Sequence, residues 1–171
     1  MIGWYSETKG YWETSNTPSA EIQNAWPSDT AQVALRPSPL HEIDGGAWVG
    51  PTIDQLKVEK LEELAQIRFE AEYGGFSSGG VEVDTSDRTR NFIAASYTKA
   101  LADPSYSVPS FKSAPGVFTT LNAAQIIGIG DLIVDHVQAC FTNEATISVL
   151  INDATNEAEL NAIDLNAGWP S

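Results

Sequence analysis

His136 and Cys140 are the two side chains in this sequence whose types and spacing could do chemistry. They lie four residues apart in a segment with helical periodicity, so we expect both on one face of a helix. A histidine beside a thiol could serve a nucleophile as its general base, or both could ligate a metal. The sequence has no other cysteine and one other histidine, His41, which is too few to close a four-ligand site of these residue types. We therefore interpret Cys140 as a small core residue, with His136 beside it at the surface.

Paired carboxylates are the second group with chemical potential. Asp131 and Asp135 share the face of a predicted helix, while Asp84 and Asp87 lie where another helix is expected to begin. Two acids could hydrolyse a glycoside, but neither pair shows a recognisable glycosidase spacing. The helix dipole explains Asp84 and Asp87, because its amino-terminal end is positive. No phosphate-binding glycine loop, nucleophile elbow or HExxH motif is present, so the sequence predicts no catalytic residue, no metal ligand and no cofactor.

Aromatic side chains in the first fifty residues give a more informative pattern. This segment holds four of the five tryptophans and few other large apolar side chains. The rings must either fold back over the rest of the chain or contact a partner, and both interpretations stay open. Tryptophan and tyrosine are typical anchors of protein interfaces. The candidate partner-binding residues are Trp4, Tyr5, Tyr11, Trp12, Trp26 and Trp48.

The charge of the chain restricts the class of partner. Acidic residues number 23 against 9 basic ones, giving a formal net charge of -14, and residues 113–171 contain no lysine or arginine. Such a surface repels nucleic acid and anionic lipid, so we expect neither as a partner and expect a protein patch rich in lysine and arginine instead. The amino terminus lacks the features of a signal peptide, and the most apolar run, residues 123–134, is shorter than the roughly 20 residues of a membrane span. We expect a protein of the reducing cytoplasm.

The elements that would position these residues form an α+β fold that divides near residues 50 and 51. Residues 1–50 predict a small β-rich arm with a hairpin over residues 4–13, a weakly alternating segment over 31–35 and a second hairpin over 43–49. Because this arm has little aliphatic content, we expect it to lack a core of its own.

Residues 51–171 predict a helical domain of about four helices with two short β-hairpins. Apolar periodicity and capping residues set the helices, and glycine-containing turns set the hairpins. Thr85 or Ser86 is the expected cap of the second helix, and Asn122 with Gln125 predicts a capping box for the longest one. The predicted helices cover residues 53–71, 85–101, 122–151 and 156–163, and the hairpins cover 76–83, with a turn at 79–80, and 107–121, with a turn at 113–116.

An ordered series of short segments resembles a phage domain of unknown function that recurs in tail-fibre and tail-fibre-assembly proteins of tailed bacteriophages. The arm is similar to the amino-terminal layout of fibre-assembly proteins, through Trp4-Tyr5-Ser6 and the segment Arg36 to Val49. The series in the helical domain comprises Leu64-x-x-Ile67-Arg68, Gly74-Gly75-Phe76, Val81 to Thr85, the helix from Asp87 to Leu101, Thr120 to Gln125, His136-Val137 and Ala162 to Pro170.

This resemblance implies a non-enzymatic tail protein that binds the tail fibre or a neighbouring baseplate or tail protein. The chain would be an assembly chaperone, a small component retained in the virion tail, or both, acting in the host cytoplasm during assembly. A homo-oligomer is a further alternative. A tail-associated hydrolase of polysaccharide or peptidoglycan that uses acidic residues is the competing expectation.

Overall fold

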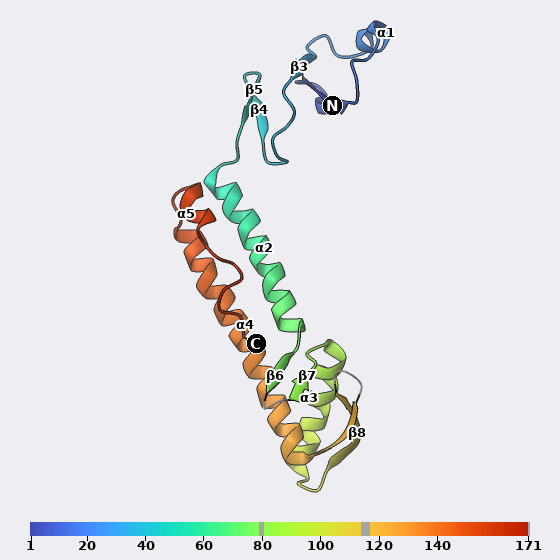
Figure 1. Cartoon of the computed structure of the whole chain (residues 1–171), viewed down its shortest axis with the longest axis vertical. Helices are drawn as coiled ribbons and strands as arrows, with labels where there is room; N and C mark the ends of the chain where they lie inside the picture. Colours follow the sequence, from blue (N-terminus) through green and yellow to red (C-terminus); the bar gives the residue numbers. More distant parts are fainter. Residues whose placement is uncertain (79–80, 114–116, 171) are drawn as a thin grey trace. The chain divides into compact units, whose positions relative to one another are not determined.

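A computed structural model describes residues 1–78, 81–113 and 117–170 of the chain (Figure 1). It separates into two compact units, Met1–Leu56 and Lys57–Ser171. The predicted boundary at residues 50 and 51 lies just before helix α2 (Ile53–Tyr73), whereas the two units divide within the first turns of that helix. As predicted, the fold is α+β, with strands in the first unit and helices joined by short antiparallel hairpins in the second.

A three-stranded antiparallel sheet organises the arm, residues 1–50, which make up most of the first unit. Strands β1 (Ile2–Ser6) and β2 (Gly10–Thr14) form the predicted hairpin, and β3 (Ala31–Val33) pairs with the other edge of β1. Gly10 has a φ of +79°, a conformation that glycine adopts without strain, and this closes the hairpin loop.

The remaining elements of the arm are short. Helix α1 (Ala20–Asn24), which the sequence pattern did not predict, follows β2. The second predicted hairpin is confirmed as β4 (Glu42–Asp44) and β5 (Ala47–Val49), joined by two glycines with positive φ angles.

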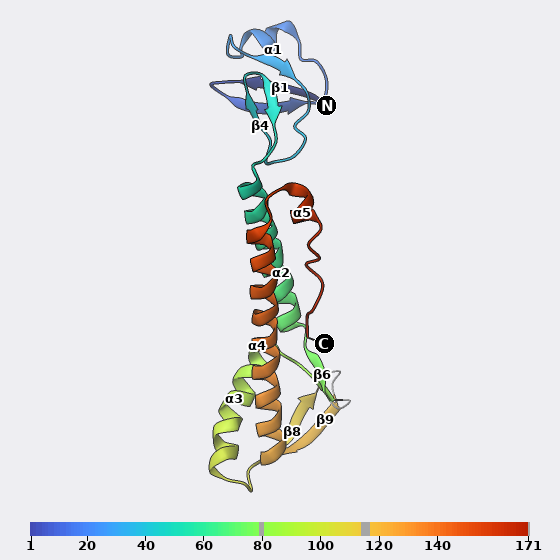
Figure 2. The same cartoon turned by 90° about the vertical axis from the view of Figure 1, so that its left-hand side faces the viewer.

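Two long helices form the frame of the second, helical unit. Helix α2 runs beside α4 (Ala123–Asp153) in the opposite direction, as both views show (Figures 1 and 2). Lys57 near the start of α2 donates to the carbonyl of Asn152 near the end of α4, at 2.6 Å. Helix α5 (Glu157–Asn161) follows, and the last residues return along α4, where Asn143 donates to the carbonyl oxygen of Ala167 at 2.9 Å.

Helix α3 (Asp87–Ala102) and two hairpins pack around the amino-terminal half of α4. The hairpins are β6 (Phe76–Ser78) with β7 (Val81–Val83), and β8 (Ser107–Ser113) with β9 (Val117–Asn122). Both pairings are those predicted. The predicted turn at residues 79–80, and residues 114–116 of the turn predicted at 113–116, lie outside the described residues.

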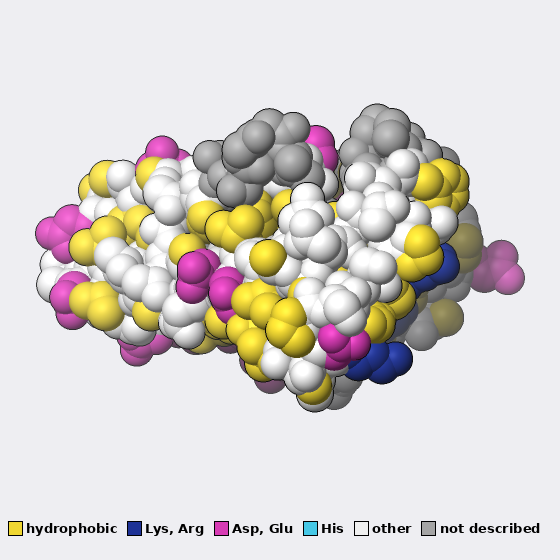
Figure 3. All heavy atoms as spheres, turned by 90° about the horizontal axis from the view of Figure 1, so that it is seen from below, with side chains coloured by type: hydrophobic (Ala, Val, Ile, Leu, Met, Phe, Trp, Pro, Cys, Tyr) yellow, Lys and Arg dark blue, Asp and Glu magenta, His cyan; other side chains and the backbone are white. Residues whose placement is uncertain are grey.

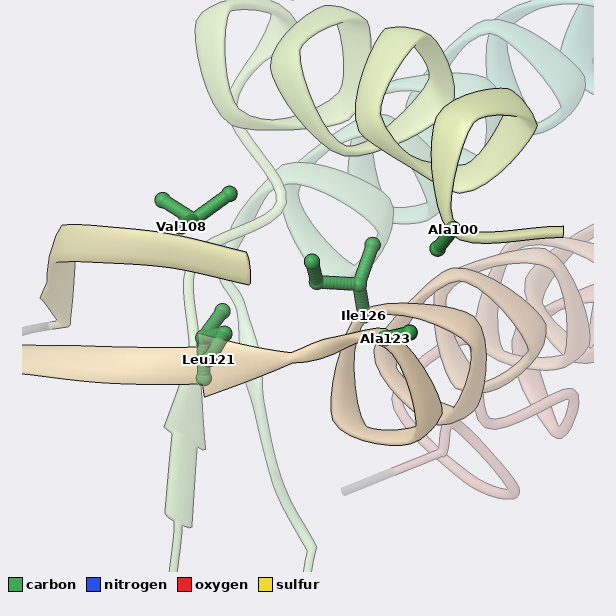
Figure 4. Packing of buried hydrophobic residues seen from close by; sticks show 5 residues of the cluster. All are labelled: Ala100, Val108, Leu121, Ala123 and Ile126. Atoms are coloured by element: carbon green, nitrogen blue, oxygen red, sulfur yellow. The ribbon is translucent and has the colours of Figure 1, made fainter. Parts of the chain in front are cut away.

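The core of the helical unit lies where these hairpins meet α3 and α4. One cluster joins a residue of α3, one from each strand of the β8–β9 hairpin and the first turn of α4 (Figure 4). A second joins the β6–β7 hairpin to the middle of α3 and α4. The two clusters share Phe111 and Ile129, so they form one continuous apolar layer. Their buried members are Ala100, Val108, Leu121, Ala123 and Ile126, and Phe76, Val83, Ile93 and Ile133.

The predicted capping residues are confirmed at the start of α4, whereas at the start of α3 neither candidate side chain caps the helix. Asn122 and Gln125 form the complete capping box of α4, with bonds of 2.9 and 3.0 Å between each side chain and the other residue's backbone N–H. At α3, Ser86 occupies the cap position, but its hydroxyl donates to Asp84 and does not cap the helix. Thr85 is fully buried, and its hydroxyl accepts from the backbone N–H of Gly75.

The end of the helical unit near β8 and β9 exposes several hydrophobic side chains, as the view from below shows (Figure 3). Phe118 of β9 and Leu101 of α3 are among the most exposed. No helix within the described residues is long and apolar enough to cross a membrane.

Candidate protein-binding site

The six aromatic candidates lie on the β1–β2 hairpin and on the segments that pack against it. In the register of this hairpin, Trp4 is paired with Trp12, and Tyr5 with Tyr11. Successive side chains of a strand point to opposite faces, so the two tryptophans lie on one face of the sheet and the two tyrosines on the other. The arm therefore has a tryptophan face and a tyrosine face.

On the tryptophan face, Trp26 packs edge-on against both strand tryptophans. Its ring centroid lies 5.0 Å from that of Trp4 and 5.2 Å from that of Trp12. Trp4 is 7% exposed and donates its indole N–H to Thr14, whereas Trp12 and Trp26 are half-buried. The Lys9 ammonium lies 4.4 Å from the centroid of the Trp12 ring. Trp4 thus holds the cluster together, and the other two rings reach the surface.

On the tyrosine face, Tyr11 packs edge-on against Trp48 of β5, with ring centroids 5.0 Å apart. The Tyr11 hydroxyl accepts from the backbone N–H of Arg36, and the Trp48 indole donates to the carbonyl of Ala34. These bonds tie the β4–β5 hairpin to the sheet. Tyr5, Tyr11 and Trp48 are all half-buried.

Among the described residues of the arm, Trp4 is the one hydrophobic side chain that is buried, so the arm has only a minimal core of its own, built on aromatic rings. Aromatic rings supply the buried area that the missing aliphatic side chains would have given, because each ring buries far more surface than a valine or leucine. The core is small, so five of the six candidates stay partly exposed. The same unit also exposes Ile22, Leu35 and Val49, each to about half.

The His136 and Cys140 pair is brought together in the helical unit, but both side chains are buried, so the predicted surface position of His136 is wrong. Its ring stacks on Phe76, and Nε2 lies 3.1 Å from the carbonyl oxygen of Ala71 and 3.8 Å from the Cys140 sulfur. A carbonyl only accepts, so Nε2 carries a proton and cannot take one from the thiol. Burial, and then the charge of Glu72, raise the pKa of Cys140, which keeps the thiol protonated and unreactive.

A buried carboxylate that the sequence analysis missed lies next to this pair. Glu72 of α2 is buried, and both Arg68 of α2 and Arg90 of α3 donate to it. Arg90 also donates to the backbone carbonyl of Glu72 at 2.7 Å, and Arg68 lies 3.4 Å from Glu144 of α4. The i, i+4 spacing of Arg68 and Glu72 was visible in the sequence, but the arrival of Arg90 and Glu144 was not. This network joins α2, α3 and α4, so we assign it a structural role.

The two aspartate pairs have different surroundings. Asp84 accepts from Thr89 and Ser86 at the start of α3, and Asp87 accepts from the Tyr73 hydroxyl. Hydrogen bonding from Thr89 and from Ser86 holds the pKa of Asp84 below its usual value. Both therefore serve the helix start, as the sequence suggested.

Asp131 and Asp135, in contrast, line an open groove of about 770 Å3 between α3 and α4. Asp131 accepts from the Tyr97 hydroxyl at 2.8 Å, and this bond crosses from one helix to the other. The groove depends on how closely the two helices approach, which the sequence pattern of either helix does not reveal. Among the described residues, no group of three or more histidine, cysteine or acidic side chains is placed to hold a metal ion.

Comparison with known families identifies the family to which the helical unit corresponds. The sequence profile of the domain of unknown function DUF4376 matches residues 55–165, which is more than half of the chain. The chain belongs to DUF4376. The matched range begins two residues into α2 and continues through α5, and it leaves out the sheet and both tryptophan-bearing hairpins of the arm. No curated protein and no solved structure matches the chain significantly.

Proposed function

We propose that this DUF4376 protein is a non-enzymatic tail protein of a tailed bacteriophage that binds the tail fibre or a neighbouring tail subunit. The observation that carries the proposal is the aromatic surface of the arm. Five half-buried aromatic rings lie on two faces of one small sheet, in a unit outside the family domain. Amphipathic rings held rigidly at a surface lose little conformational entropy when a partner covers them, which is why they are common binding hot spots.

The phage assignment is supported by the resemblance of the ordered segments described above, from Leu64 to Pro170 and in the arm. The binding role is supported by the chemistry of the ionisable groups. The buried acid Glu72 is held by two arginines, and the thiol of Cys140 is protonated and buried, so neither is poised to react. The alternative of a tail hydrolase has no observation of this kind in its favour.

Two forms of this function differ in when the protein leaves its partner. An assembly chaperone would bind the fibre in the host cytoplasm and be absent from finished particles. A tail component would bind the fibre in the host cytoplasm and would also be present in finished particles. The acidic surface of the chain favours a basic patch on the fibre or tail subunit in either case.

The test is affinity capture of the tagged full chain from infected cells, together with mass spectrometry of purified particles of the phage that encodes it. The proposal predicts that a fibre or tail protein is recovered with the chain from the lysate. Presence of the chain in particles would identify a tail component, and absence would identify a chaperone. Recovery of no fibre or tail protein with the chain from the lysate, together with absence of the chain from the particles, would contradict the proposal.

A further inference from the structure

The groove between α3 and α4 has the composition of a binding site for a cationic segment of another protein. We propose that it binds a protein segment in which lysine or arginine alternates with apolar residues. This proposal goes beyond the function proposed for the arm, because it concerns the family domain and uses none of the aromatic residues of the arm.

The floor of the groove is apolar and well packed. Ile93 of α3 and Ile133 of α4 are buried at its base, and Val134 stands at its rim with 68% of its surface exposed. A volume of about 770 Å3 falls within the range of pockets that hold small ligands or a few side chains. The methylene groups of a long side chain would cover the exposed valine and remove apolar surface from water.

The rim of the groove carries negative charge that the chain itself does not neutralise. Asp131 and Asp135 are exposed one turn apart on α4, and within the described residues neither forms an ion pair with a lysine or arginine. Arg90, the cation that lines one end of the groove, is already held by Glu72. A guest ammonium or guanidinium group between the two aspartates would therefore meet two unpaired carboxylates.

Tyr97 adds a third feature that favours a cation. Its hydroxyl donates to Asp131, which fixes the ring across the groove between the two helices. An aromatic face beside two carboxylates attracts a cation through the ring as well as through the charges. An acidic segment would be repelled by the same groups, and a purely apolar one would cover two carboxylates without supplying a cation to neutralise them. The occupant that fits is therefore both basic and apolar.

The test uses the full chain labelled with 15N and a short synthetic peptide in which lysine and leucine alternate. The proposal predicts that the peptide shifts the amide signals of Ala94, Gly130 and Val134 at low ionic strength. A peptide with glutamine in place of lysine should bind at least about tenfold more weakly. Added salt should weaken binding of the lysine peptide as the ionic strength rises to about 0.1 M, where charges are screened.

Three variants distinguish binding in the groove from non-specific attraction to the overall negative charge of the chain. The double variant Asp131→Asn with Asp135→Asn should weaken peptide binding at least about tenfold. The control Glu59→Gln with Glu63→Gln removes the same charge from the exposed face of α2 and should change peptide binding less than about twofold. Val134→Ser should also weaken binding, because it removes only apolar contact. Equal weakening by both charge pairs, or shifts scattered over the chain, would show non-specific attraction and overturn the proposal.

The arm provides a further control. Trp12→Ala should leave peptide binding in the groove unchanged. Failure of the groove test would therefore leave the function proposed for the arm standing, and failure of the arm to capture a tail protein would leave the groove test unaffected.

Discussion

The ring of Tyr97 lies so close to Gly130 that no side chain could replace this glycine hydrogen without movement. A Cβ atom at Gly130 would stand 2.5 Å from the Tyr97 Cδ2 atom and 3.0 Å from Cε2. The glycine thus permits the close approach of α3 and α4, and with it the bond from Tyr97 to Asp131.

Replacement of this glycine should therefore lower stability, even though alanine favours helices. We expect Gly130→Ala to reduce the free energy of unfolding by about 1–3 kcal/mol, because the Tyr97 ring must move. Gly128→Ala is the matched control on the same helix, since its Cβ would meet nothing within 4 Å. That variant should gain about 0.5–1 kcal/mol. Urea denaturation measures both, and equal effects of the two substitutions would contradict the packing described.

Removal of the Glu72 carboxylate from its network should destabilise the helical unit. Glu72→Gln keeps the shape of the side chain but leaves two arginines without their carboxylate. We expect a loss of about 3 kcal/mol, the lower end for buried ion pairs, because the guanidinium-bearing side chains keep 18% and 19% exposure. The exposed neighbour Glu70 provides the control, and Glu70→Gln should stay within about 0.5 kcal/mol of the wild type. Similar losses in both variants would argue against the network.

The start of α3 should respond to acid through Asp84. Its pKa is lowered by hydrogen bonding from Thr89 and then from Ser86, so the ionised form stabilises the folded state. This stability is present above the unfolded pKa of about 3.9 and is lost as the pH falls through the lower folded pKa. The difference in unfolding free energy between wild type and Asp84→Asn should therefore be largest near neutral pH and shrink below about pH 4. A difference that is constant with pH would show that the charge does not matter.

The helical unit should fold without the arm. A variant that lacks residues 1–50 keeps Thr52 and Gln55, whose side chains exchange hydrogen bonds with each other's backbone at the start of α2. It also keeps both core clusters and the Glu72 network. We expect a single cooperative melting transition by circular dichroism. A broad, non-cooperative loss of signal would show that the arm contributes to the core of the helical unit.

Local patterns in the sequence predicted those parts of the fold that depend on neighbouring residues. The hairpin of Trp4 and Trp12 followed from a glycine-containing loop between aromatic runs, and the start of α4 followed from Asn122 and Gln125. Strand alternation could also have separated the tryptophan face from the tyrosine face, because residues 4 and 5 of one strand must point in opposite directions.

Features that join distant segments could not be predicted in this way. His136 is buried because Phe76 stacks on its ring and the carbonyl oxygen of Ala71 accepts a hydrogen bond from it, and both residues come from other elements. The pairing of Arg90 with Glu72 and the approach of Tyr97 to Gly130 likewise depend on how α3 packs. Helix periodicity indicates which face is apolar, but it does not indicate which neighbour that face will meet.

The proposal that the aromatic surface of the arm binds a phage tail protein is tested most directly by removing one half-buried ring from each face. Trp12→Ala with Trp48→Ala should leave the helical unit folded by circular dichroism and weaken capture of the fibre or tail subunit about thirtyfold, the effect of losing roughly 2 kcal/mol at a hot spot. Phe118→Ala, which removes an exposed ring from the helical unit, should capture the partner at the wild-type level. Capture of the same amount of tail protein by the double variant and by the wild type would contradict the claim.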